Sequence, residues 1–230
     1  MSLKAILNTR SQAIIESCVE TTIEALIASK NGADRLELCS SLDQDGLTPG
    51  PTLLKETASQ VHIPIKVMIR PRAGNFIYDA ADKQIIDNHI AYCHELGVKE
   101  WVYGSIKSES GRLDMEDIKA FASKVHPETL TIHKAIDRST DILRDVFDLV
   151  KWSKKSGINL SILSSGGAAT AIEGAMMLNR MARICGTEVE LVVAGKVTHD
   201  NLNQIKEAIP APAYHGRRIV NLTQHTDEGA

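Results

Sequence analysis

Two short segments near the start of the chain each place a carboxylate and a thiol two residues apart. Glu16 precedes Cys18, and Glu37 precedes Cys39 at the same spacing. Successive side chains of a β-strand point to opposite faces, so each pair shares one face if its segment is a strand. A buried carboxylate is costly unless it is paired or binds something. Two such strands side by side would gather two carboxylates and two thiols in one small volume.

The two thiols are candidate metal ligands. Thiolates are soft ligands that suit Cu(I), so Cys18 and Cys39 are predicted to hold that ion. They can share one ion only if their sulfurs lie within about 4.6 Å, which is twice a metal–thiolate bond of about 2.3 Å. The alternative is that both cysteines pack as small buried hydrophobes. Cys93 and Cys185 lie in helical segments and are predicted to be structural.

The charged residues suggest a second kind of chemistry. Glu16 and Glu37 could form a general acid/base pair or a cation site, or an ion network that closes the protein interior. Arg70 is the expected counter-charge of Glu37. His133, with Asp137 four residues later, could be a base oriented by a carboxylate or a metal ligand. The alternative for His133 is a core histidine with satisfied hydrogen bonds.

Several further residues are candidates for binding an anionic ligand. Guanidinium groups on either side of Pro71 could hold a carboxylate or phosphate, with Arg70 expected inward and Arg72 at the rim. Short Gly-containing segments later in the chain could cradle a phosphate with backbone N–H groups, although tight turns explain them equally well. The candidate ligand-binding residues are Arg72, Ser165, Gly166, Lys196 and His215.

The elements that must position these residues form a repeating pattern. Short apolar, β-branched runs alternate with segments of helical period, as in parallel sheets covered by helices. Gly32, Gly97 and Gly157 each separate a predicted helix from the next strand, and the apolar stripe of the helix over residues 141–156 predicts that Phe147 faces inward. The predicted strands are Ile14–Val19, Arg35–Ser40, Pro64–Arg70, Glu100–Ile106, Thr129–Ile136, Asn159–Gly166, Val189–Val197 and Pro212–Val220.

Eight strands with seven intervening helices predict an α/β fold, a (β/α)₈ TIM barrel that forms a single domain over residues 1–230. Only residues 221–230 follow the last predicted strand, so the eighth helix is expected to be incomplete or missing. A second copy of the chain could shield the surface left bare, which predicts a homo-oligomer, most simply a dimer. Alternatively, the N-terminal stretch Ala5–Leu7 could cover it. In such barrels, functional residues lie at the carboxyl ends of the strands.

Bulk composition narrows the class of partner. The 230 residues carry a net charge of −3, which argues against nucleic acid or an anionic membrane bound by bulk electrostatics. No apolar run approaches the roughly 20 residues that span a bilayer. The four cysteines show no CxxC spacing and no disulfide framework. These features predict a cytoplasmic protein with free thiols.

Several of these segments resemble the CutC family of copper homeostasis proteins. The resemblance implies a TIM barrel, commonly oligomeric, that binds and traffics copper in the cytosol. The matching motifs, which run in order from Met1 to about Val220, are Glu16-x-Cys18, Gly32-Ala33-Asp34-Arg35-Leu36-Glu37-Leu38-Cys39, Gly46-Leu47-Thr48-Pro49, Ile69-Arg70-Pro71-Arg72-x-Gly74, Phe76-x-Tyr78, Thr131-x-His133-x-Ala135-x-Asp137 and Ser164-Ser165-Gly166-Gly167.

The later part of the chain departs from the family pattern. The family's His-Arg-Ala-Phe-Asp is His133-Lys134-Ala135-Ile136-Asp137 here, and a glycine-rich loop is reduced to Ala194-Gly195-Lys196. Three functions stay open. The first is Cu(I) binding at the barrel mouth. The second is an enzyme of unassigned reaction that uses the Glu, Arg, His and Asp candidates on a small anionic or sugar-like substrate. The third is a catalytically inactive scaffold.

Overall fold

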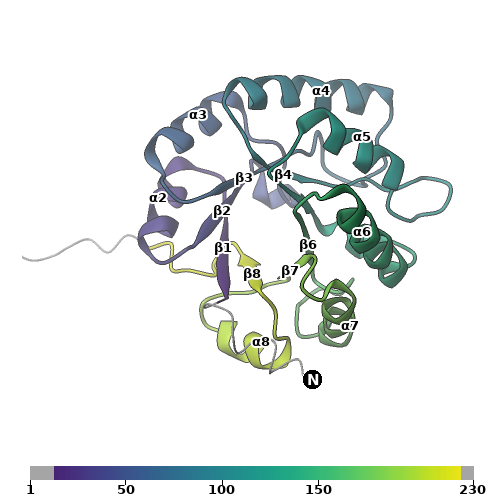
Figure 1. Ribbon diagram of the computed structural model, residues 1–230. Coiled ribbons are helices and arrows are strands. Elements are labelled where there is room, and N and C mark those ends of the chain that lie inside the picture. The colour runs from purple at the N-terminus through teal and green to yellow at the C-terminus, as the bar shows by residue number, and fades with distance from the viewer. Residues whose placement is uncertain (1–12, 224–230) are drawn as a thin grey trace, which may run out of the picture.

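The protein is a closed barrel of eight parallel strands that follow one another around the barrel in chain order (Figure 1). The computed structural model describes residues 13–223. Its strands are β1 (Ile14–Val19), β2 (Arg35–Leu38), β3 (Ile65–Met68), β4 (Glu100–Tyr103), β5 (Thr129–Ile132), β6 (Leu160–Ser164), β7 (Glu190–Val193) and β8 (Ala213–Gly216). Parallel pairing of β1 with β8 closes the sheet.

In this described part of the chain, seven α-helices connect successive strands and cover the outside of the barrel. Within residues 13–223 no helix follows β8, so the predicted TIM barrel with a reduced final helix is confirmed. The stretch Ala5–Leu7, the alternative cover, lies outside the described residues. The helices are α2 (Thr22–Lys30), α3 (Pro51–Gln60), α4 (Ala80–Glu95), α5 (Met115–Val125), α6 (Ile142–Ser156), α7 (Ala175–Cys185) and α8 (Leu202–Ala208).

The strands lie where the apolar runs predict them, but most end earlier than predicted. The first matches β1 residue for residue, whereas the fifth is predicted to reach Ile136 and β5 ends at Ile132. His133 therefore lies after β5 and not within it, and Lys134–Arg138 form a 3₁₀ turn, η2. The apolar runs continue past the last ladder hydrogen bond because the βα loops also pack against the core.

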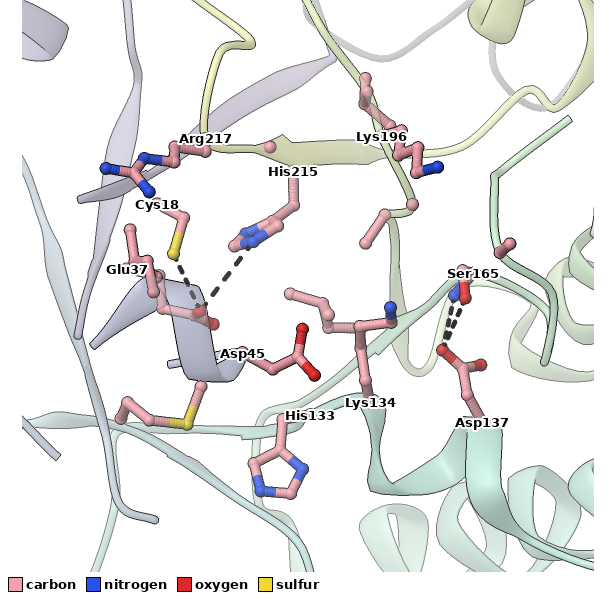
Figure 2. Close-up of a pocket in the computed structure, with 18 of the residues that line it drawn as sticks. Cys18, Glu37, Asp45, His133, Lys134, Asp137, Ser165, Lys196, His215 and Arg217 are labelled. Carbon is pink, nitrogen blue, oxygen red and sulfur yellow. Dashed lines mark hydrogen bonds and ion pairs between the residues drawn. The ribbon is translucent and has the colours of Figure 1, made fainter. Parts of the chain in front are cut away.

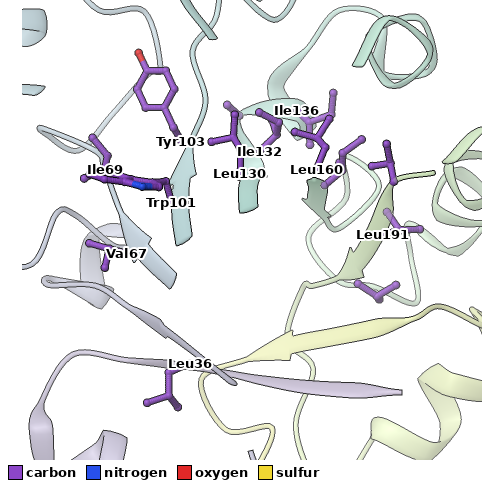
Figure 3. Packing of buried hydrophobic residues seen from close by; sticks show 14 of the residues in the cluster. Leu36, Val67, Ile69, Trp101, Tyr103, Leu130, Ile132, Ile136, Leu160 and Leu191 are labelled. Atoms are coloured by element: carbon purple, nitrogen blue, oxygen red, sulfur yellow. The ribbon is translucent and has the colours of Figure 1, made fainter. Parts of the chain in front are cut away.

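Alternate strand residues face opposite sides of the sheet, and the two sides differ in chemistry. Large apolar side chains such as Leu36, Trp101 and Leu130 are fully buried in the hydrophobic core cluster (Figure 3). The residues between them face the barrel interior, where polar groups meet, as when Lys66 Nζ of β3 donates to Thr131 Oγ1 of β5 at 2.8 Å. Two small apolar clusters share this interior. The barrel interior is therefore mixed, and the main apolar core is a ring around it.

The helix caps follow from the sequence. The side chain of Asp141 accepts a hydrogen bond from the backbone N–H of Arg144, and Gly157, in a left-handed conformation, caps the carboxyl end of α6. The prediction that Phe147 faces inward is wrong, because this side chain is 50% exposed. No helix in the described part of the chain has the length and apolarity needed to cross a membrane.

Candidate functional site

The two Glu-x-Cys segments meet at the carboxyl ends of β1 and β2. Cys18 Sγ and Cys39 Sγ lie 3.8 Å apart, within the limit of about 4.6 Å set by a shared ion. Glu37 Oε1 lies 3.6 Å from Cys18 Sγ and 3.5 Å from Cys39 Sγ. All three side chains are buried. Two sulfurs and one carboxylate oxygen therefore surround a space of the size that a metal ion requires.

His215 joins the two glutamates and is more central than its sequence context indicates. Its Nδ1 lies 2.8 Å from Glu16 Oε1. Its Nε2 lies 3.9 Å from Glu37 Oε1, a contact that Figure 2 draws. β8 pairs with β1, and the register sets His215 directly opposite Glu16. The imidazole therefore links the carboxylate of β1 to the carboxylate of β2, and with them it forms a second group of potential metal ligands.

A buried ion network lies below these residues, and its cations were not among the sequence candidates. Arg35 Nε donates to Glu16 Oε2 at 2.5 Å, and Lys66 Nζ lies 3.2 Å from the same oxygen. Arg35 Nη2 also reaches Glu190 Oε1 at 2.6 Å. The alternation of side chains along a strand could have identified Arg35, because it lies on the same face of β2 as Glu37, two residues later. The network supplies the counter-charge of Glu16.

The predicted ion pair between Glu37 and Arg70 is absent from the described residues. The Arg70 guanidinium donates to three backbone carbonyls, those of Gln44 at 2.8 Å, Gly46 at 3.0 Å and Gly74 at 3.2 Å. Arg70 is inward and buried, as expected, but it fixes the loops after β2 and β3. The carbonyl groups of these loops are free to accept from the guanidinium because the turns leave them without partners in the sheet.

His133 is buried and held in one tautomer. Its Nδ1 accepts a hydrogen bond from the backbone N–H of Ala135 at 3.1 Å, so the neutral ring carries its proton on Nε2. Burial, reinforced by the charge of Arg70, lowers the pKa of His133 to about 3. A Cβ at Gly104 would lie 2.9 Å from Nδ1, so glycine there makes room for the ring. The ring packs 4.8 Å from that of Phe76.

Asp137 does not orient His133, contrary to prediction. Its carboxylate accepts hydrogen bonds from the Ser164 hydroxyl at 2.5 Å, from Ser165 N–H and hydroxyl at 2.9 Å each, and from Gly167 N–H at 3.0 Å. It therefore shapes the loop after β6. Gly166 belongs to the same loop, where its φ is +72° and a Cβ would lie 2.6 Å from the Gly174 carbonyl oxygen. Both features require glycine at this position.

A cavity of about 870 Å³ opens at the carboxyl ends of the strands and connects these groups. Cys18, Glu37 and His215 line one side, and Lys134 and Lys196 line the side formed by the loops after β5 and β7 (Figure 2).

The other predicted ligand-binding residues divide between the cavity and its surroundings. Ser165, Lys196 and His215 border the cavity, whereas Arg72 and Gly166 are not among its lining residues. Arg72 is instead held by Asp82 at 2.8 Å. Anion binding by Arg72 would therefore compete with an ion pair that already occupies its guanidinium.

The cluster around the thiols has perturbed proton affinities. The hydrogen bond with Cys39 and the nearby His215 lower the pKa of Cys18 to about 6 against the effect of burial, whereas the same hydrogen bond and burial raise the pKa of Cys39. Burial raises the pKa of Glu37 to about 8. Burial opposes ionisation of Glu16 as well, but Lys66 and its other partners hold its pKa well below the usual range. One thiolate beside a protonated carboxyl is the arrangement that these shifts favour.

The remaining two cysteines lie away from the barrel mouth. Cys93 of α4 and Cys185 of α7 are buried in the hydrophobic core cluster. Burial raises the pKa of each thiol to about 12, so both are protonated and unreactive at neutral pH. Cys18 at the barrel mouth therefore differs from both in position and in acidity, whereas Cys39 differs from them in position alone.

The sequence of this chain is similar to those of one protein family. The model of the CutC family matches residues 13–219. The copper homeostasis protein cutC homolog of Homo sapiens is 30% identical over 202 residues, which cover 88% of this chain and 72% of the human protein. A CutC family protein of Vibrio atlanticus is 32% identical over 203 residues, which cover 87% of this chain and 80% of the Vibrio protein.

Solved structures give the same result. The crystal structure of the putative copper homeostasis protein CutC from Streptococcus agalactiae superposes with a TM-score of 0.82 at 28% identity, covering 91% of this chain and 100% of the other. Phosphoribosyl anthranilate isomerase from Thermococcus kodakaraensis superposes with a TM-score of 0.55 at 13% identity, covering 89% of this chain and 87% of the other. The second likeness concerns the barrel fold alone.

Proposed function

Because the chain belongs to the CutC family, we propose that it serves copper homeostasis by binding Cu(I) between the thiols of Cys18 and Cys39. The observation that carries this proposal is the distance of 3.8 Å between the two sulfurs. Soft thiolates on adjacent strands are the donors that Cu(I) prefers, and they reach this distance without backbone movement.

The surroundings of the thiols support the same proposal. A metal ligand must be deprotonated, and the environment of Cys18 already lowers its pKa to about 6. Glu37 Oε1 lies within 3.6 Å of both sulfurs, where a carboxyl can orient the ligands or join them. His215 borders the same volume. The ion network under Glu16 keeps this side of the cavity in place.

A titration with matched variants tests the proposal. Reduced protein is titrated with Cu(I) in the presence of a competing chelator, and Cys18→Ser and Cys39→Ser are compared with Cys93→Ala, whose thiol lies on α4. We expect affinity to fall by about tenfold or more in the first two variants and to stay at the wild-type value in the third. Equal affinity in all four proteins would rule out a copper site at this pair.

A second candidate function is an enzyme that acts on a small anionic or sugar-like substrate. The contact of 2.8 Å between His215 Nδ1 and Glu16, at the wall of a large cavity, favours it because an oriented imidazole can transfer protons. Incubation with a panel of sugar phosphates, followed by proton NMR, tests this candidate. Conversion by the wild type and loss of conversion in His215→Asn would support it, and an unchanged panel would count against sugar phosphates as substrates.

Two further expectations belong with the proposal. The four cysteines are unpaired and buried, which supports function in a reducing compartment, and we propose the cytoplasm.

We also propose that the protein is a homodimer. Apolar side chains on α2, which packs against β1, support this, because Ile23 is 61% exposed and Leu26 is 39% exposed.

A further inference from the structure

The thiol pair leaves a coordination position open. Two sulfurs 3.8 Å apart are closer than the separation of about 4.6 Å that a linear S–Cu–S arrangement needs. An ion shared by Cys18 and Cys39 at this distance is therefore bent, with room for a third ligand. Cys18 borders the cavity and Cys39 does not. A third ligand can thus approach such an ion from the cavity.

The wall across the cavity carries positive charge without carboxylate partners. Six Lys or Arg side chains line the cavity against three Asp or Glu, although the whole chain has a net charge of −3. One of the three, Asp137, is occupied by four hydrogen bonds from the loop after β6. On this wall, the lining cations that form no ion pair with any described residue are Lys134 and Arg138 after β5 and Lys196 after β7. Arg218, after β8 on the side of the thiols, is a fourth such cation.

Two buried donors on the cavity lining also have no acceptor among the described residues. They are Arg70 Nε and His133 Nε2. The second carries a proton because Nδ1 of the same ring accepts the Ala135 N–H. These two atoms are buried beneath the cavity surface, so it is the unpaired cations that favour a ligand rich in acceptor oxygens. The cavity therefore has a sulfur-bearing side and a side that suits carboxylate groups.

We propose that the cavity binds a small thiol that carries carboxylate groups and that delivers Cu(I) to Cys18 and Cys39. This inference rests on the proposed function and names the form in which the ion arrives. The thiol sulfur occupies the third position on copper, and its carboxylates lie against the cations of the loops after β5, β7 and β8. The volume of about 870 Å³ is within the range of small-molecule pockets and far exceeds that of a bare ion.

The transfer is a ligand exchange and balances without a redox step. The incoming Cu(I) carries two thiolates, and one cysteine sulfur replaces one of them. The departing thiolate takes the proton of that cysteine, or a proton from water where the cysteine is already ionised, and leaves as a neutral thiol group. The other cysteine sulfur adds to copper as a third ligand and releases its proton, if it holds one, to water. Copper stays Cu(I), and no electron changes hands. The thiol that keeps its bond to copper is the one that the cavity retains.

Co-retention of the thiol tests the inference. Reduced protein receives Cu(I) complexed either by glutathione, which is anionic, or by 2-mercaptoethanol, which is neutral, and bound copper and bound thiol are measured after gel filtration. We expect glutathione to be retained with copper about tenfold more strongly than 2-mercaptoethanol. High salt should reduce that preference, because screening shortens the reach of exposed charges.

Charge variants locate the effect. Lys134→Gln with Lys196→Gln should remove the preference for glutathione, whereas Lys151→Gln with Lys155→Gln, two exposed lysines of α6, should leave it unchanged. Equal retention of both thiols by the wild type, or an unchanged preference in the first pair of substitutions, would overturn this inference alone. If copper binds from neither thiol, the proposed function fails and this inference fails with it.

Discussion

Replacing Glu16 with glutamine tests how the polar groups of the barrel interior are held together. The carboxylate is fully buried and contacts Arg35 at 2.5 Å, His215 at 2.8 Å and Lys66 at 3.2 Å. The substitution removes the charge that these three groups share, and Lys66 is left fully buried with Glu190 3.9 Å away. Breaking a buried pair by removing one partner costs about 3–5 kcal/mol.

Thermal and denaturant unfolding measure this loss. At about 2–4 °C per kcal/mol for a chain of this size, Glu16→Gln should lower Tm by about 6–20 °C. The matched control is Glu128→Gln, which breaks an exposed pair with Lys99 at 3.3 Å and should cost about 0–1 kcal/mol. Adding Lys66→Met to Glu16→Gln should cost less than the sum of the two single changes. Equal values of Tm for Glu16→Gln and Glu128→Gln would show that the network around Glu16 is solvated and contributes no more than an exposed ion pair.

Three further results are expected. The unfolded chain takes up a proton on His133 below its ordinary pKa of 6.5 and the folded protein does not, so stability falls as the pH falls. Between pH 7.5 and 5.5 the wild type should lose about 1.4 kcal/mol more than His133→Gln in denaturant titrations, and parallel curves would exclude a buried neutral ring. Gly166→Ala should destabilise the protein by more than about 1 kcal/mol, because the added Cβ would lie 2.6 Å from the Gly174 carbonyl oxygen. Gly50→Ala is the control, because nothing lies within 4 Å of its added Cβ. Equal melting temperatures for the two variants would contradict the loop geometry. Sedimentation at micromolar concentration should show a dimer of the 25.1 kDa chain, and a soluble monomer would defeat that proposal.

The fold was predictable because its signals are local and repeated. Apolar runs, helical stripes and the glycines between them determine the order of strands and helices, and β1 was predicted to the residue. The carboxyl ends of the strands were less predictable. Apolar residues such as Ile136 continue past the last ladder hydrogen bond, because loops over the barrel are themselves packed.

The site was predictable where spacing along a strand determines which side chains share a face. This holds for the proximity of Cys18 and Cys39. Partners across the barrel were not predictable, because they depend on register and on the path of loops. The counter-charge assigned to Glu37 was Arg70, yet Arg70 binds loop carbonyls and the buried cations contact Glu16. Asp137 was likewise matched to the wrong partner, since the loop after β6 takes up its carboxylate.

The atoms bound to copper test the proposed Cu(I) site most directly. X-ray absorption on reduced protein loaded with one equivalent of Cu(I) from an acetonitrile complex reports the atoms bound to the metal. We predict at least two sulfur neighbours at about 2.3 Å, with one lost in Cys18→Ser and one in Cys39→Ser. A first shell made only of nitrogen and oxygen, or a shell unchanged in both variants, would rule out a Cu(I) site between Cys18 and Cys39.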